Sequence, residues 1–159
     1  MKDLTEDNLV DHRNLVFIEL NDLKDHHKVE LNDLVLRSRG QTNTAALVHL
    51  NTAPSVVAAP LLRIRVEKDS ILPAYLCWFI NQPSSQTFLQ SRATGTAMRM
   101  IGKSVLDDLE IMVPSMNMQQ HIVRLEKLSS QEQRLMNKLS IKKQLLMHKI
   151  LIDLATEIQ

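Results

Sequence analysis

The sequence is poor in the residues that build disulfides and nucleotide-binding loops. It has one cysteine, Cys77, which can form neither an internal disulfide nor a cysteine metal site by itself, and we interpret it as a buried core thiol. Only three glycines occur, Gly40, Gly95 and Gly102, and they are too scattered for a P-loop or a dinucleotide-binding fingerprint. These absences predict a chain that carries no cofactor.

Catalytic and metal-binding patterns are also missing. The adjacent histidines at 26 and 27 would point in different directions on a strand or a helix, so they do not favour one metal ion. The neighbouring acids Asp107 and Asp108 are explained by the dipole of a short helix, and no serine lies in a strained nucleophile turn. We therefore expect a non-catalytic protein without a metal. A small α/β enzyme is the functional alternative that the sequence supports least.

No apolar run approaches the length needed to cross a bilayer. The first seven residues are acidic, whereas a signal peptide begins with positive charge followed by apolar residues. An apolar fraction of 44% and a charged fraction of 23% are those of a soluble globular protein. The sequence thus predicts a cytoplasmic protein with no membrane contact.

The net charge of +1 hides an uneven distribution of charge. Residues 1–34 carry nine acidic and four basic side chains, whereas residues 35–117 carry eight basic and five acidic ones. Most basic residues of the middle segment are arginines, whose planar guanidinium suits phosphate and guanine. A polyanionic partner is one interpretation, and an ordinary solvated surface is the other.

Residues 1–114 are expected to form a mixed α/β domain. Short strands are predicted near residues 34–39, 45–48, 56–59, 62–66, 98–101 and 110–113, with a weak strand signal at 15–18. Helices are predicted over residues 70–80 with Asp69 or Ser70 as cap, from Pro83 to about residue 89, and from Ser104, as cap, to residue 109. Side chains alternate along a strand, so Arg37 and Arg39 share a face beside the polar loop at residues 41–44.

Residues 115–159 contain no glycine or proline, and their apolar residues recur at helical spacing. The stretch from Asn117 to Gln120 resembles a capping box, with Asn117 as the cap. A helix from residue 118 to the end would be roughly 60 Å long at about 1.5 Å per residue. The stripe expected to face a partner helix is formed by Ile122, Leu125, Leu128, Leu135, Leu139, Leu146 and Ile150. A helical hairpin is the alternative, but no glycine or proline marks a turn, so we favour a coiled-coil helix that pairs with another molecule.

Several segments, taken in order, resemble the target recognition domain of type I restriction-modification specificity subunits. They are VELNDLVLRSRG (29–40), ILPAYLCWFIN (71–81), GTAMRMI (95–101), Val113-Pro114 and QQHIV (119–123). The resemblance covers about residues 28–155. It implies an α/β domain that reads one half of a bipartite sequence in double-stranded DNA, followed by a long helix that acts as a spacer.

The same resemblance implies a specificity subunit that docks methyltransferase and restriction subunits and has no catalysis of its own. Its DNA contacts are expected in two loops and their flanking residues: Arg37, Arg39, Gln41, Thr42, Asn43, Arg92, Thr94, Thr96, Arg99 and Lys103. The residue types suit this role independently, because arginine matches guanine, asparagine and glutamine match adenine, and lysine or threonine can hold phosphates. For each residue, an ordinary surface position is the alternative.

The sequence departs from the family in having one recognition domain and one helix where two of each are usual. Asn32 precedes Asp33 where glycine is common, and Ser115 follows Pro114 where a second proline is frequent. We therefore expect a half-subunit or fragment, which an antiparallel homodimer of the C-terminal helix would complete by two-fold symmetry. A coiled-coil adaptor that does not bind DNA is the alternative function.

Overall fold

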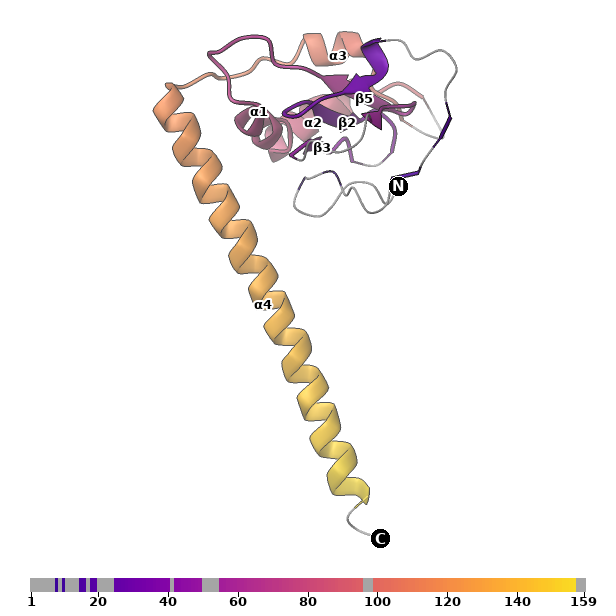
Figure 1. Ribbon diagram of the computed structural model, residues 1–159, viewed down its shortest axis with the longest axis vertical. Helices are drawn as coiled ribbons and strands as arrows, with labels where there is room; N and C mark the ends of the chain where they lie inside the picture. The colour runs from indigo at the N-terminus through magenta and orange to yellow at the C-terminus, as the bar shows by residue number, and fades with distance from the viewer. Residues whose placement is uncertain are drawn as a thin grey trace. The chain divides into compact units, whose positions relative to one another are not determined.

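The computed structural model describes residues 8, 10, 15–16, 18–19, 25–40, 42–49, 55–95 and 99–156. These residues form a mixed α/β fold followed by one long C-terminal helix, α4 (Met116–Thr156), as the sequence predicts (Figure 1). The chain divides into two compact units, Met1–Val123 and Arg124–Gln159. The first unit contains every strand that the structure describes, and the functional division after residue 114 stays a prediction.

Two small antiparallel sheets form the centre of the first unit (Figure 1). The larger sheet has the order β3 (Ala45–Leu47), β2 (Leu34–Arg37), β5 (Leu61–Ile64), and the smaller sheet pairs β1 (Lys28–Val29) with β4 (Ser55–Val56). The predicted strands at 34–39, 45–48 and 62–66 are therefore present, each within two residues of its expected start. The weak signal at 15–18 is wrong, because the described residues there are not in a strand.

The main core lies between the larger sheet and two helices, α1 (Pro73–Ile80) and α2 (Pro83–Ser91). Leu34 and Leu36 of β2 are fully buried there, in contact with a cluster that includes Leu76 and Leu89. Cys77 belongs to the same cluster, and burial raises the pKa of its thiol to about 12, which confirms the prediction of an inert core cysteine. β2 thus lies beneath α1 and α2, and α2 leads into the segment that carries Arg92 and Thr94.

The opposite face of β2 is also buried. Val35 packs there with Ala46, Val48 and Val57, and Val10 completes the cluster. The N–H of Val10 donates to the carbonyl of Leu47 at 3.3 Å, so this early residue lies along the free edge of β3. The acidic N-terminal region therefore contributes to the core, although its sequence gives only a weak pattern.

Three predicted helices are present, and α2 begins at Pro83 as expected, but the caps predicted for the first and third helices are wrong. The cap position of α1 is Leu72, not Asp69 or Ser70, and its side chain makes no capping bond. Pro73 does occupy the first turn, where its missing N–H costs nothing. The third helix, α3 (Lys103–Asp107), has Gly102 at its cap position, which places Ser104 inside the helix.

The long helix begins earlier than expected, at Met116. The Ser115 hydroxyl accepts a hydrogen bond from the N–H of Met118 at 3.4 Å, so Ser115 is the capping residue and the proposed box on Asn117 is wrong. The next residue, Gln119, is fully buried, and its side-chain amide hydrogen-bonds to the backbone of the segment that precedes α1. This amide fastens the start of α4 to the α/β domain.

Three predicted strands are absent or reduced. Residues 110–113 are irregular, because the hydroxyl of Tyr75 takes up the carbonyl of Met112 at 2.7 Å while Ile111 packs against the core. Of the strand predicted at 98–101, the described part forms only an isolated bridge at Met100. The strand expected at 56–59 is limited to β4 and ends at Val56.

One buried ion pair joins β5 to the turn before β2. Arg65 donates to both carboxylate oxygens of Asp33, at 2.7 and 2.8 Å, and also pairs with Glu30 at 3.1 Å. Burial disfavours the charged form of Asp33, but the hydrogen bonds from Arg65 and from the backbone of Glu30 outweigh it and hold the pKa of Asp33 below its ordinary value. Asp33 in turn raises the pKa of Arg65. Arg65 is therefore a structural residue.

Within the part of the chain that the structure describes, no helix combines the length and the apolar character that a membrane crossing requires.

Candidate nucleic-acid interface

Three segments that are distant in the sequence lie side by side at one end of the larger sheet. Met100 bridges Arg39 on one side and Thr94 on the other, both in the antiparallel sense. The bridge to Thr94 has two hydrogen bonds, of 2.8 and 3.0 Å, and the N–H of Ile101 donates to the carbonyl of Ser38 at 2.7 Å. The end of β2, the segment after α2 and the segment before α3 therefore form one continuous surface.

This surface carries three exposed arginines, one from each segment. A guanidinium nitrogen of Arg39 lies 3.9 Å from the sulfur of Met100, and Arg99 donates to the carbonyl of Gln90 at 3.3 Å. The guanidinium carbon of Arg92 lies 3.8 Å from the centre of the Phe88 ring, a cation–π contact that restrains the side chain. Among the described residues no carboxylate pairs with these three arginines, so their charge is available to an anion.

Arg37 occupies a different environment from Arg39. It is half-buried, and its Nε atom is buried without a hydrogen-bond partner among the described residues. Its chain turns directly afterwards at Gly40, whose φ of 129° favours glycine. Arg37 therefore presents only part of its guanidinium to solvent.

Asn43 is buried, with 2% of its surface exposed. Its side-chain amide donates to the carbonyl of Arg37 at 3.0 Å, and its backbone N–H and carbonyl both pair with the side chain of Gln86 at 3.1 Å. The side chain of Asn43 thus helps to fix the loop between β2 and β3. The predicted contact between Asn43 and DNA stays a prediction, and its observed contacts are all within the protein.

The other predicted contacts that the structure describes are distributed over three places. Thr94 is exposed within the three-segment surface, and Thr42 is exposed in the β2–β3 loop. Lys103 is exposed at the start of α3, where it borders a hollow of about 260 Å³ that Arg63 of β5 also lines. Gln41 and Thr96 lie outside the described residues.

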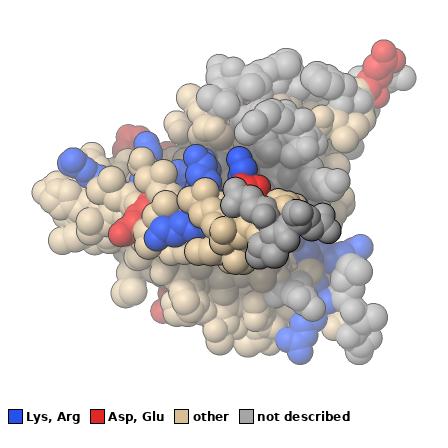
Figure 2. Space-filling model, turned by 90° about the horizontal axis from the view of Figure 1, so that it is seen from below, with Lys and Arg blue, Asp and Glu red and all other residues tan. Residues whose placement is uncertain are grey.

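Basic side chains do not form one continuous patch on the face drawn in Figure 2. They stand in separate groups, with uncharged and some acidic residues between them. Separate cationic groups suit contact with discrete phosphates better than adhesion to a uniformly charged surface.

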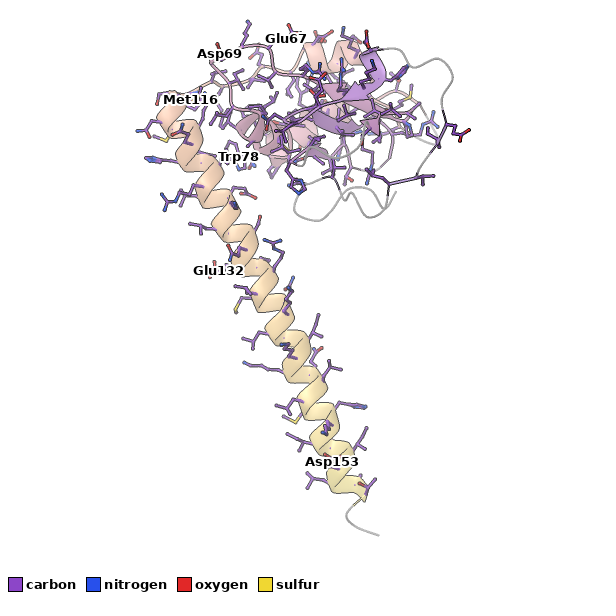
Figure 3. The ribbon with its side chains drawn as sticks, in the orientation of Figure 1. Glu67, Asp69, Trp78, Met116, Glu132 and Asp153 are labelled. Carbon is purple, nitrogen blue, oxygen red and sulfur yellow. The ribbon has the colours of Figure 1, made fainter. Side chains whose placement is uncertain are left out.

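The stripe predicted on α4 is exposed along the second unit. Leu125, Leu139 and Leu146 expose 67%, 48% and 60% of their surfaces, and Leu128, Leu135 and Ile150 are exposed as well. Ile122 differs, because it is half-buried in the first unit, where it lines an apolar groove with Met118 of α4 and Trp78 of α1 (Figure 3 labels Trp78). Exposed leucines at regular intervals indicate a surface that another helix can cover.

Sequence reasoning missed Phe88, Gln86 and Met100. The spacing of Phe88 and Arg92, four residues apart on a predicted helix, is the signal that could have found their contact. Gln86 and Met100 gave no such signal, because their roles depend on pairings between distant segments.

A comparison with known families gives one match. Residues 12–145 match the family model described as type I restriction modification DNA specificity domain, which covers most of the chain. No curated protein matches the chain.

Proposed function

Because the chain belongs to the family of type I restriction-modification DNA specificity domains, we propose that it reads one half of a bipartite DNA site for such a system. Residues 1–114 supply the reading surface, and residues 115–159 are a spacer and a dimerisation helix. The chain acts in the cytoplasm and carries no catalysis, and it docks the methyltransferase and restriction subunits that modify and cut the DNA.

The observation that carries this proposal is the meeting of Arg39, Arg92 and Arg99 on one surface. A guanidinium is always charged and presents its donors in a plane, so it binds a phosphate oxygen pair or the edge of guanine in two-pronged fashion. Arg92 and Arg99 are each restrained by a contact within the protein, so they suit phosphates at fixed positions. Arg39 and Thr94 lie in one row and suit base edges.

The loop residues extend this surface. Thr42 is exposed next to the turn after β2, and Arg37 at the end of β2 is partly exposed. Gln41 and Thr96 remain proposed contacts from their residue types. Lys103 borders the hollow beside β5, so we assign it a phosphate contact at the margin of the site.

Exposed leucines on α4 support a homodimer. A two-fold axis would place one recognition domain at each end of the paired helices, which restores the two-part reading head from a single gene product. The dimer would read a two-fold symmetric bipartite site.

The residues of α4 that would face a partner helix form a seam, and the charged residues in this seam favour an antiparallel pair of helices. Seam positions spaced alternately by four and three residues include Ile122, Leu125, Leu139, Leu146 and Ile150, but also Glu132 and Lys143. In a parallel pair in register, Glu132 would face Glu132 and Lys143 would face Lys143. In an antiparallel pair that overlaps nearly the whole helix, with its axis between positions 137 and 138, Glu132 faces Lys143 instead.

The same antiparallel register brings apolar seam residues together. Leu125 then faces Ile150, and Met136 faces Leu139, so an apolar layer lies on the inner side of each charged layer, while Ser129 faces Leu146 on its outer side. Opposite charges within a seam stabilise the orientation that pairs them and disfavour the other. The helix therefore specifies its own direction of pairing.

Selection from a pool of random DNA duplexes tests the recognition role. The full chain, alone and mixed with a type I methyltransferase subunit, should enrich a two-fold symmetric sequence. Affinity for that duplex should fall steeply with salt, and Arg92→Ala and Arg99→Ala should each lower the slope of log affinity against log salt by about 1. Lys68→Ala, an exposed cation outside this surface, is the matched control and should leave the slope unchanged.

The alternative is an adaptor that uses α4 for assembly and does not bind DNA. It predicts helix-driven dimers, no enriched sequence in either selection and no salt-dependent affinity for duplex DNA. That result would exclude the recognition role while leaving the dimer intact.

A further inference from the structure

Arg39, Met100 and Thr94 form a row across three adjacent segments. Met100 is the middle member, bridged on both sides in the antiparallel sense. Directly opposed residues of antiparallel segments project their side chains to the same face. A cation, a thioether and a hydroxyl therefore stand side by side, and all three residues are exposed.

The width of this row suits the major groove of DNA. Neighbouring strands lie about 4.8 Å apart, so three of them span about 10 Å. The minor groove, about 6 Å wide, is narrower than this row, whereas side chains that project from the row can reach base edges in the major groove, which is about 12 Å wide. Arg39 matches guanine there, and Thr94 can pair with either kind of hydrogen-bonding group.

Met100 is the apolar member of an otherwise polar surface. It leaves 42% of its surface in solvent, and its sulfur touches the guanidinium of Arg39 at 3.9 Å. A protein partner would need a larger apolar area than one isolated side chain supplies. The only apolar group on a base edge in the major groove is the 5-methyl group of thymine.

We propose that Met100 is a specificity-determining residue that contacts the 5-methyl group of one thymine in the DNA half-site. This inference rests on the proposed recognition function. The unbranched thioether fits an irregular apolar surface, and burying a methyl group against it favours thymine over cytosine at that position. Arg39 and Thr94 flank the contact and fix which base pair Met100 reaches.

The test uses the duplex that the full chain enriches from a random pool. Each thymine is replaced in turn by deoxyuridine, which lacks only the methyl group. At one thymine per half-site, the replacement should weaken binding of the wild-type chain roughly three- to tenfold. Met100→Ala should bind both duplexes equally, at about the affinity of the wild-type chain for the deoxyuridine duplex.

Two variants separate the methyl contact from a structural effect. Met100→Leu keeps an apolar side chain and should keep a preference for thymine at the same position. Met112→Ala removes another exposed methionine of the same unit and should discriminate thymine from deoxyuridine as the wild-type chain does. A purely structural role of Met100 would lower the affinity of Met100→Ala for both duplexes and leave the ratio unchanged.

Different outcomes test the recognition function and the role of Met100. Absence of any enriched sequence overturns the recognition function and this inference with it. An enriched sequence that contains no thymine, or one whose every thymine tolerates deoxyuridine, overturns the role of Met100 alone. Loss of discrimination in Met100→Ala with retention in Met112→Ala supports it.

Discussion

Gln119, near the start of α4, accepts a hydrogen bond from the N–H of Leu72, which immediately precedes α1, at 2.9 Å. The same amide donates to the carbonyls of Ser70 at 2.8 Å and Pro114 at 2.9 Å. All of its hydrogen-bonding atoms are therefore used within a fully buried environment. One side chain thus ties the beginning of the long helix to the segment that leads into α1.

Replacing Gln119 by Leu should destabilise the first unit by about 2–4 kcal/mol. The change keeps the volume but removes the partner that the amide supplies to the N–H of Leu72 and to the carbonyls of Ser70 and Pro114, and it leaves an apolar side chain among these polar groups. Denaturant unfolding followed by circular dichroism measures the effect. Gln120→Leu, one residue further along and exposed, is the control and should change stability by less than about 0.5 kcal/mol. Equal effects of the two variants would contradict the role assigned to Gln119.

Asp33→Asn should lower the free energy of unfolding by about 2–3 kcal/mol near pH 7, because it removes the charge that Arg65 binds. The pKa of Asp33 is lower in the folded chain than the ordinary value of 3.8, so the ionised carboxylate contributes its full stability above that value. This contribution is lost as the pH falls below 3.8 and through the pKa of the folded state.

Unfolding curves measured at several pH values check the direction of this pH dependence. The difference in stability between wild-type and Asp33→Asn chains should shrink as the pH falls below 3.8. Glu67→Gln neutralises an exposed carboxylate and should leave stability nearly unchanged at every pH. A gap that stayed constant down to the most acidic condition would mean that the ion pair is not its source.

Charge reversal in the α4 seam should reveal the direction of pairing. In the antiparallel dimer, Glu132→Lys places two lysines in the same layer and should weaken association roughly tenfold, a loss of about 1.4 kcal/mol. Adding Lys143→Glu to Glu132→Lys should restore the wild-type affinity, because each of these layers then again pairs a lysine with a glutamate. Sedimentation equilibrium over a range of concentrations measures both variants.

A parallel pair in register gives a different pattern. There, the single and the double variant would keep like charges opposed, as in the wild-type chain, so neither would change the dissociation constant. Leu139→Lys together with Leu146→Lys places lysines in the apolar part of the seam in either orientation and should give a monomer. A wild-type chain that stays monomeric at high concentration would exclude the dimer altogether.

The apolar core and the long helix could be predicted from the sequence because their signals are local. The run of apolar and β-branched residues that leads to Gly40 predicted β2, and the recurrence of leucines after residue 115 predicted α4. Both patterns follow directly from the geometry of a strand or a helix. The positions of Arg39, Arg92 and Arg99 at or near loops predicted that these three side chains are exposed.

The cap positions of α1, α3 and α4 could not be predicted, because other residues with good capping side chains lie close to each of them. Ser115 and Asn117 are both good caps, and only the buried amide of Gln119 decides that the helix starts at the earlier one. The strand expected at 110–113 failed for a similar reason, since its carbonyl at Met112 is bound by Tyr75 and not by a neighbouring strand. Such choices depend on partners far away in the sequence.

Gln86 binds both backbone groups of Asn43, as a neighbouring strand would, and it does so from a helix. The far end of the β2–β3 loop is therefore secured independently of the residues that precede it. Insertions or exchanges between Gly40 and Thr42 would reshape the exposed part of the loop while Ala45 and Ala46 kept their places in the sheet. The scaffold can thus accept new loop sequences, and with them new DNA preferences, at little cost to its stability.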